Sequence, residues 1–570
     1  MYRQEKADRI AEIISLASDA ADASSQKDKD TISYTGFSAF IQTLFDDALP
    51  DELATYDSHQ LFHAALSFWR FSAQRKPNEV LLRVHNPNVA EHGWESPYTI
   101  LEIVSDDMPF LVDSILGELT DQDISLKSVL HPIANVDRDD QGCRTDFASG
   151  VDDLSNTARR ESLIHIQCER HTDERRLAFI QKRLETIVQE VRGVVADFVP
   201  MRDRLDEAIE GLQDMAMTVD AEEIAECQAF LTWLRDDHFA LLGSRIYRFE
   251  GEPETGTLEP VAETGLGLLR DPNARILRRG DKLVSFTSEV REFLMLPSPI
   301  IITKANVRSE VHRRVYMDYI GVKLFNTQGE LTGECRFVGL FTAEAYNRSI
   351  SRIPLLSRKV DRVIERAGFM SSSFNKKALT NILETYPRDE LFQTSEDELL
   401  RITLGILDLH ERPRTRLFVR RDRYDRYVSA LVYIPRDRYD SHTRQKVADI
   451  LVTSYQGRLS AFYPQFNDSP LARIHFIIGR NPDDAFNHPN TDDVEQAIVE
   501  ATRNFSDALS QVLKPVYGDE GRRPLVARYG DAFSAGYREH NTAEDASLDI
   551  EKLEPLGAPP AIGLRCYQRE

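Results

Sequence analysis

The sequence predicts an α+β protein of several domains, made of split β-α-β units, a sheet-rich block and helical segments. Two stretches each alternate strand-like and helix-like apolar patterns in the order β-α-β-β-α-β. A block of apolar and β-branched runs lies between them. The chain has 570 residues, which at about 100–200 residues per domain corresponds to roughly three to five domains.

The first region, residues 1–96, is predicted to be helical. Apolar residues recur at helical spacing around Ile10–Ala17 and again around Phe37–Phe45, and a third helix is expected from Ser58. A polar loop at Ser24–Asp30 separates the first two helices.

The first split β-α-β unit is predicted at residues 97–200. Strands are expected at Tyr98–Val104, Ser125–Val136, Ser162–Glu169 and Val194–Val199, with helices carrying Leu111–Leu119 and beginning near Thr172. The connection Asp137–Glu161 is long and acidic, which indicates a surface loop.

A helical connector (201–235), a sheet-rich domain (236–345) and a helical motif (346–412) are predicted next. In the sheet-rich domain, strands are expected at Phe239–Phe249, Pro299–Lys304, Tyr316–Phe325 and Leu331–Phe341, with a hairpin turn at Asn326–Gly329.

The second split β-α-β unit is predicted at residues 413–530. Its expected elements are a strand at Tyr427–Ile434, a helix from Ser441, a strand pair at Gly457–Phe466 and Leu471–Gly479, a helix at Asp492–Leu513 and a last strand near Leu525–Tyr529. Residues 531–570 are predicted to be a linker followed by the start of a further strand at Ala561–Tyr567. Because the sequence stops on that strand, we expect the natural chain to continue.

Charge and cysteine usage narrow the class of protein. The formal net charge is −23, so neither nucleic acid nor an anionic membrane is an expected partner. No apolar run approaches the roughly 20 residues of a spanning helix, and the N-terminus lacks the pattern of a signal peptide. Five scattered cysteines indicate reduced thiols and a cytoplasmic location.

The short motifs of common catalytic and cofactor sites are missing. The nearest approach to a dinucleotide loop is Gly265-Leu-Gly267-Leu-Leu-Arg270, which lacks the third glycine. Cys168 and His171 are a conceivable metal pair, but without a second pair a buried thiol and a surface imidazole are favoured. We therefore expect no metal, no cofactor and no catalytic residue in this chain.

One loop between a predicted strand and a helix is the main candidate site. It consists of Asp106, Asp107, Met108, Pro109, Phe110 and Leu111. A helix N-terminus suits an α-carboxylate and neighbouring aspartates suit an ammonium group, so both ends of an amino acid could be bound there. The alternative is structural, with Asp107 capping the helix and Pro109 in its first turn.

A second candidate is His312, which lies among arginines in Ser309-Glu-Val-His-Arg-Arg314. A catalytic base would need an orienting carboxylate, and a polar or interdomain contact is the favoured interpretation.

Several runs carry a family resemblance. Asp107–Leu111 resembles the D-x-P-G-L loop of ACT domains, which bind amino acids at that turn. Other stretches are similar to the N-terminal segment of the large bacterial NAD-dependent glutamate dehydrogenases. They are Asp106–Asp113, His131–Pro132, Ser309–Arg313, Tyr316–Ile320 and Tyr386–Gln393.

The resemblance implies ACT-like domains at 97–200 and 413–530, a PAS-like domain at 236–345, helical motifs, and a third ACT-like domain beginning at Ala561. It implies a regulatory and oligomer-building role in an enzyme that converts L-glutamate and NAD to 2-oxoglutarate, ammonia and NADH. That enzyme's catalytic region, with its NAD, would be absent from this chain. The implied partners are the catalytic part of the same polypeptide, further copies of the chain and an amino-acid effector.

Two departures qualify the effector site. Phe110 stands where ACT domains usually have glycine, so its side chain would fill the space of an amino acid. In the second unit the corresponding turn, with Arg436 and Asp437, lacks the D-x-P-G-L pattern and is the weaker candidate. The alternatives to a regulatory segment are a free-standing amino-acid sensor and an enzyme with a site around His312.

Overall fold

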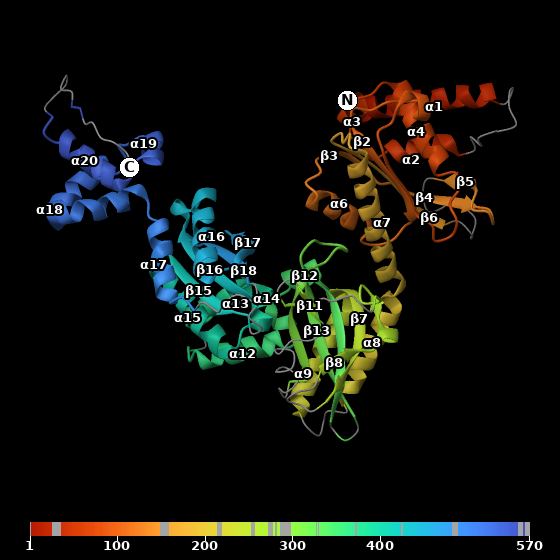
Figure 1. Ribbon diagram of the computed structural model, residues 1–570. Coiled ribbons are helices and arrows are strands. Elements are labelled where there is room, and N and C mark those ends of the chain that lie inside the picture. The colour runs from red at the N-terminus through yellow and green to blue at the C-terminus, as the bar shows by residue number, and fades with distance from the viewer. Residues whose placement is uncertain are drawn as a thin grey trace. The chain divides into compact units, whose positions relative to one another are not determined.

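The computed structural model of the chain contains helices and antiparallel sheets in two compact units, one mainly of residues 1–348 and the other mainly of residues 349–570 (Figure 1). The described residues are 2–24, 36–148, 159–213, 219–251, 257–271, 277–279, 282–284, 298–326, 328, 330–370, 373–422, 426–480, 488–556 and 563–564. The predicted multi-domain α+β class is confirmed. Among these residues, no helix combines the length and apolar character needed to cross a membrane.

The first sheet holds six strands in the order β1-β2-β6-β4-β5, with β3 also paired to β6. The strands are β1 (Leu81–His85), β2 (Thr99–Asp106), β3 (Leu126–Leu130), β4 (Ile133–Arg138), β5 (Arg144–Ala148) and β6 (Arg159–Cys168). Helices α6 (Leu111–Asp121) and α7 (Glu174–Ala196) pack against each other beside this sheet. The short helix α5 (Val89–His92) lies between β1 and β2 in the chain.

Four predictions for this sheet are wrong. Val194–Val199 is not a strand, because α7 continues to Ala196 and α8 (Phe198–Gly211) follows it. The edge beside β2 is occupied instead by β1, from the region predicted to be helical. Pro132, which has no N–H to donate, divides the expected Ser125–Val136 strand into β3 and β4. The expected surface loop Asp137–Glu161 contains β5, which forms a hairpin with β4.

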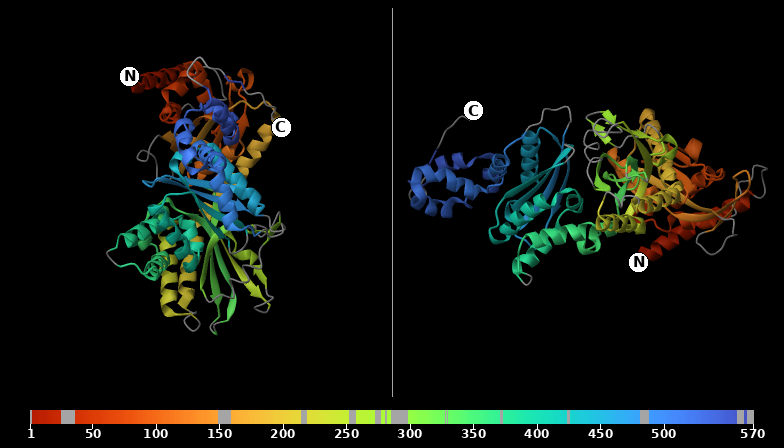
Figure 2. Two further views of the ribbon diagram at one scale, coloured as in Figure 1. Left: turned by 90° about the vertical axis from the view of Figure 1, so that its left-hand side faces the viewer. Right: turned by 90° about the horizontal axis from the view of Figure 1, so that it is seen from below.

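The second sheet confirms all four strands predicted for the sheet-rich domain. Its order is β12-β13-β14-β7-β8, with β9 paired to β7. The strands are β7 (Phe239–Glu250), β8 (Thr257–Pro260), β9 (Leu266–Gly267), β12 (Ile300–Arg308), β13 (Tyr316–Phe325) and β14 (Leu331–Phe341). Helix α8 packs on β7 and β13 and is backed by α9 (Ala221–Trp233), as the yellow helices beside the green strands in Figure 2 show. A separate hairpin pairs β10 (Leu277–Arg279) with β11 (Lys282–Val284).

The third sheet repeats the arrangement of the first. Strands β15 (Arg416–Arg421), β16 (Tyr427–Pro435), β17 (Arg458–Gln465) and β18 (Leu471–Gly479) lie in the order β15-β16-β18-β17. Helices α16 (Ser441–Tyr455) and α17 (Thr491–Ala501) cover one face. The expected last strand near Leu525–Tyr529 is wrong, since these residues end helix α18 (Phe505–Tyr529). As in the first sheet, an N-terminal strand, here β15, takes the edge.

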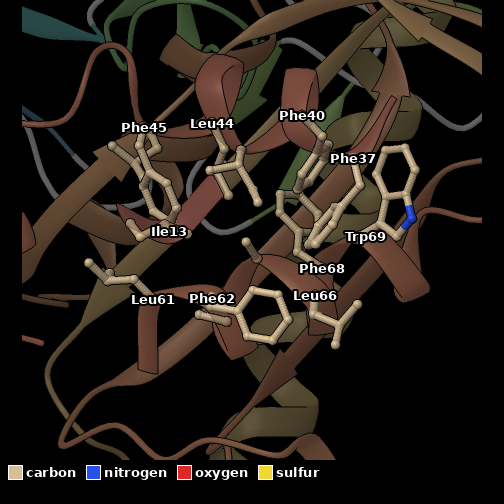
Figure 3. Packing of buried hydrophobic residues seen from close by; sticks show 14 of the residues in the cluster. Ile13, Phe37, Phe40, Leu44, Phe45, Leu61, Phe62, Leu66, Phe68 and Trp69 are labelled. Atoms are coloured by element: carbon tan, nitrogen blue, oxygen red, sulfur yellow. The ribbon is translucent and has the colours of Figure 1, made fainter. Parts of the chain in front are cut away.

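The N-terminal helices form a second layer over the first sheet. They are α1 (Tyr2–Ser24), α2 (Phe37–Phe45), α3 (Pro50–Ala54) and α4 (Ser58–Phe71). Figure 3 shows their aromatic core, where the ring centroids of Phe40 and Trp69 are 5.1 Å apart. The same core includes Ile100 and Val104 of β2. The helical region and the first sheet therefore share one hydrophobic core.

The third sheet is covered in the same way by the helices that precede it. They are α12 (Leu356–Arg366), α13 (Phe374–Thr385), α14 (Arg388–Gln393) and α15 (Glu396–Glu411), while α11 (Ala343–Asn347) belongs to the first unit. The Arg473 guanidinium on β18 donates to the Thr385 carbonyl of α13 at 2.7 Å. Gly405 of α15 lies against the ring of Phe418 on β15.

The predicted linker after residue 530 is a folded helical segment. Helices α19 (Ala535–His540) and α20 (Ala543–Leu553) follow α18, and α18 and α20 share a core of Leu509, Leu513, Leu525, Ala546 and Ile550. The predicted strand at Ala561–Tyr567 lies largely outside the described residues.

Candidate functional site at the first turn of α6

The loop Asp106–Leu111 joins β2 to α6, as predicted, but its aspartates do not cap the helix. Helix α6 begins at Leu111, its N-cap is Phe110, and the N-cap side chain makes no capping hydrogen bond. The Asp107 carboxylate instead lies 3.0 Å from the Arg160 guanidinium. The structural alternative with Asp107 as the cap is therefore wrong, although Leu111 is buried in the core as expected.

Asp106 belongs to a buried ion network below the loop. Its carboxylate is 2.7 Å from the Arg75 guanidinium, whose side chain is 1% exposed. Arg75 also reaches Glu161 at 2.8 Å, and Glu161 in turn is 2.7 Å from Arg138. Because Asp106 already neutralises a buried cation, it is not free to receive the ammonium group of an amino acid.

Phe110 adopts a left-handed backbone conformation, with φ at 70°. Glycine is the residue that takes this conformation without steric cost, which explains why ACT loops usually have glycine here. A phenylalanine costs about 1 kcal/mol or more in this region. The half-buried ring packs against the imidazole of His312, with ring centroids 4.9 Å apart.

The loop Ser309–Val315 between β12 and β13 brings His312 to α6. The His312 backbone N–H donates to Ser114 Oγ at 2.8 Å, and His312 Nδ1 lies 3.1 Å from Asp113 Oδ2. We call the contact between Ser309–Val315 and the helices α6 and α7 the α6 junction.

Ion pairs extend the α6 junction along both helices. Arg314 of the loop lies 2.8 Å from Glu118 of α6. Arg183 of α7 contacts Glu118 at 2.8 Å and Glu310 of the loop at 2.9 Å. Gly117 allows the close approach of the loop, because an added Cβ would lie 3.0 Å from Arg314 Cγ. Two motifs that are about 200 residues apart in the sequence thus form one interdomain contact.

The geometry of His312 fits the interdomain contact better than a catalytic base. A carboxylate is present at Asp113, but this side chain is 62% exposed and the imidazole packs against the ring of Phe110 at a tilt of 44°. No hydroxyl or thiol accepts a hydrogen bond from the His312 ring in the contacts described. The imidazole therefore holds two domains together.

We expect Phe110→Gly to change the free energy of unfolding of the first unit by less than about 1 kcal/mol. The relief of left-handed strain offsets the lost ring contact and the greater freedom of glycine in the unfolded chain. Phe110→Val is the matched control and should destabilise by about 1–3 kcal/mol, because a β-branched residue keeps the strain and loses the ring. Urea unfolding compares the two, and equal destabilisation would contradict this account.

The weaker candidate turn in the second unit does not form a comparable site. Arg436 and Asp437 lie in a short turn after β16, where the Arg436 N–H donates to the Pro470 carbonyl. The start of α16 is already capped, since Asp440 accepts a 2.7 Å hydrogen bond from the Thr443 N–H. This backbone hydrogen bond holds the pKa of Asp440 below its usual value.

The remaining sequence candidates have structural roles. The Gly267 N–H donates to Asp197 Oδ2 at 2.7 Å, and an added Cβ on Gly267 would lie 2.2 Å from the Leu242 carbonyl oxygen. That glycine turn is packed against protein. Burial raises the pKa of the Cys168 thiol to about 12. Within the described ranges, no cluster of three or more His, Cys, Asp or Glu side chains could hold a metal ion.

Sequence reasoning missed a buried polar cluster in the first sheet. Glu102 on β2 pairs with Arg83 on β1 and lies 3.4 Å from His165 on β6. Burial alone would raise the pKa of Glu102, but the neighbouring imidazoles of His165 and His85 and the charge of Arg83 hold it well below its usual range. The sequence signal that could have revealed this cluster is Glu102 itself, a charged residue at an inward position of the largely apolar strand β2.

A similar cluster joins the third sheet to its covering helices. Arg420 on β15 contacts both carboxylate oxygens of Glu390 on α14, at 2.6 and 2.8 Å. His475 on β18 shares a 2.8 Å hydrogen bond with Ser429 on β16 and lies 3.9 Å from Glu390. Each cluster combines an arginine with a buried carboxylate and a buried histidine, and each reaches the helical layer, through Glu390 of α14 at the third sheet and through the 2.9 Å hydrogen bond from Arg83 to Ser67 of α4 at the first.

The first and third sheets are both antiparallel. In each, one helix follows the first core strand and another follows the last. This arrangement defines two ACT-type domains. The comparisons with known families agree. The ACT1 domain of glutamate dehydrogenase matches residues 40–184, and its ACT2 domain matches residues 416–506. Helical motif 1 of glutamate dehydrogenase matches residues 353–412 and helical motif 2 matches residues 513–556. These four segments are thus similar to the ACT and helical-motif domains of glutamate dehydrogenase.

The chain is similar to NAD-specific glutamate dehydrogenases over most of its length. It is 35% identical to the Halomonas elongata enzyme over 527 residues, which cover 91% of this chain and 32% of the relative. The Pseudomonas aeruginosa enzyme is 32% identical over 93% of this chain and 32% of the relative. The Mycobacterium tuberculosis enzyme is 27% identical over 80% of this chain and 27% of the relative. The chain thus spans about a third of the length of the first two relatives.

Proposed function

We propose that this chain is the regulatory and oligomer-building segment of a cytoplasmic NAD-specific glutamate dehydrogenase. The whole enzyme would convert L-glutamate, NAD and water to 2-oxoglutarate, ammonia and NADH, with NAD bound in a catalytic region outside these 570 residues. One observation carries the proposal. The similarity to the Halomonas elongata enzyme covers 91% of this chain but 32% of that enzyme, and the matched domains are of ACT and helical-motif type.

The α6 junction supports a role in communication between domains. An effector alters a protein only through different affinities for two states. The contacts of His312, Arg314 and Glu310 give the first ACT domain and the second sheet a common boundary through which such states can be coupled. An amino-acid effector at Asp106–Leu111 would have to displace the ring contact between Phe110 and His312. We therefore propose the first turn of α6 as a joint whose contacts an effector competes with.

The proposal also includes self-association through sheet edges. The outward faces of the first and third sheets are covered by α1–α4 and α12–α15, which leaves edges such as β17 for contacts between copies. An edge strand offers unpaired backbone groups to another chain.

A chimeric enzyme tests the proposed function. In it, this chain replaces the matching segment of the Pseudomonas aeruginosa relative. We expect the chimera to form NADH from glutamate and to keep the relative's oligomeric state, whereas the relative without this segment should lose that state. The proposal would be contradicted if the chimera and the truncated enzyme had the same activity and the same oligomeric mass. Amino-acid binding by the isolated chain that is abolished by Asp107→Ala would identify a free-standing sensor instead.

A further inference from the structure

A further carboxylate, on α7, lies near the charges of the α6 junction without a cation of its own. Glu190 is on α7, two turns after Arg183, and its Oε2 is buried with no hydrogen-bond partner. An ionised carboxylate with a buried, unbonded oxygen is costly, whereas a protonated one carries no charge to solvate.

The cations near Glu190 are already matched by other carboxylates. Arg183 is held between Glu118 and Glu310 at 2.8 and 2.9 Å. Arg314 is held by Glu118 at 2.8 Å and by Asp121 at 3.6 Å. The charged groups that act on the pKa of Glu190 are Glu118 on α6, Arg183 on α7, and Glu310 and Arg314 on the loop. Ionisation of Glu190 would add a negative charge to a cluster whose two arginines are already neutralised.

We propose that Glu190 is a proton-operated latch of the α6 junction. The junction stays closed while the Glu190 carboxyl holds its proton, and it opens more often once that group is ionised. The latch is a property of this chain and does not require the enzyme assignment.

Electrostatics set the pH range of the latch. Burial first, and then repulsion by Glu310, raise the pKa of Glu190 to about 7 against the opposing charges of Arg183 and Arg314. A carboxyl whose pKa is higher in the closed state favours closure at low pH, and this contribution is lost as the pH rises through about 7. With an ordinary glutamate pKa in the open state, the opening equilibrium should increase about tenfold between pH 6 and pH 8.

Hydrogen exchange of the 570-residue chain tests the latch directly. Exchange in α6 and Ser309–Val315, corrected for the intrinsic pH dependence, is measured at pH 6 and pH 8 for the unmodified chain and for Glu190→Gln. We expect the opening equilibrium of the unmodified chain to rise about tenfold and that of Glu190→Gln to stay constant. Glu185→Gln, on the same helix but 39% exposed, is the control and should behave like the unmodified chain. An equal pH response in the unmodified chain and Glu190→Gln would overturn the proposal.

A second variant keeps the test valid if Glu190→Gln does not fold. Glu310→Gln removes the repelling charge and frees Arg183 to pair with Glu190, so the rise in opening should move to lower pH. A rise at the same pH as in the unmodified chain would refute the latch. The pH-dependent exchange must also occur at the α6 junction. A pH effect confined to other regions of the chain would refute the latch as well.

Discussion

Glu161→Gln is expected to destabilise the first unit by about 3–5 kcal/mol, the usual cost of removing one partner of a buried ion pair. Glu161 is fully buried and accepts hydrogen bonds from the guanidinium groups of both Arg75 and Arg138. Glutamine keeps the shape of the side chain but leaves these two cations with less negative charge than they need. Asp106, at the start of the candidate loop, would then be the remaining carboxylate paired with Arg75.

Equilibrium urea unfolding, followed separately for the two units, measures this effect. Glu169→Gln is the matched control near the end of the same strand, and because its side chain is 48% exposed we expect a change within about 0.5 kcal/mol. A loss below about 1 kcal/mol for Glu161→Gln would show that the network does not hold the loop in place.

Arg420→Met is expected to destabilise the second unit by about 3–5 kcal/mol, because it leaves the Glu390 carboxylate buried without its counter-ion. Burial alone would raise the pKa of Glu390, and Arg420 is the main group that lowers it below its usual value. The side chains of Arg420 and Glu390 are 4% and 2% exposed. The pair joins α14 to β15, so its loss should loosen the helical layer from the ACT2 sheet.

A double variant separates charge from packing. Arg420→Met combined with Glu390→Leu should recover most of the stability, since apolar groups of similar size replace buried ion pairs at little net cost. Arg401→Met, at a side chain that is 61% exposed, is the control and should change stability by less than about 0.5 kcal/mol. A double variant no more stable than Arg420→Met would contradict this explanation.

The sequence predicts the strands and helices of the cores well because their apolar periods are long. The predicted strands Tyr316–Phe325 and Leu331–Phe341 have the bounds observed for β13 and β14. The errors fall on short apolar runs. Val194–Val199 and Leu525–Tyr529 fit either a strand or the buried side of a helix, and periodicity alone does not separate the two. Tertiary structure decides, because the edge that each strand would take is already filled by β1 or β15.

The residues of the candidate site could be predicted from the sequence, but the contact between its two loops could not. Asp106–Leu111 and Ser309–Arg313 are recognisable motifs, and the interdomain interpretation of His312 agrees with its contact to Asp113. Their meeting depends on pairing across about 200 residues, which local patterns do not encode. The left-handed conformation of Phe110 is equally hidden, since this backbone conformation favours glycine. Buried ion networks such as that of Glu161 depend on partners from distant strands.

We propose that this chain regulates and assembles an enzyme whose glutamate oxidation takes place outside these residues. Glutamate-dependent NADH formation, measured with the purified 570-residue chain, tests this proposal most directly. The account predicts no NADH above a mock preparation purified in parallel, at any concentration of glutamate and NAD. Sustained turnover that co-purifies with the chain and is abolished by His312→Ala would place catalysis within these residues and contradict the account.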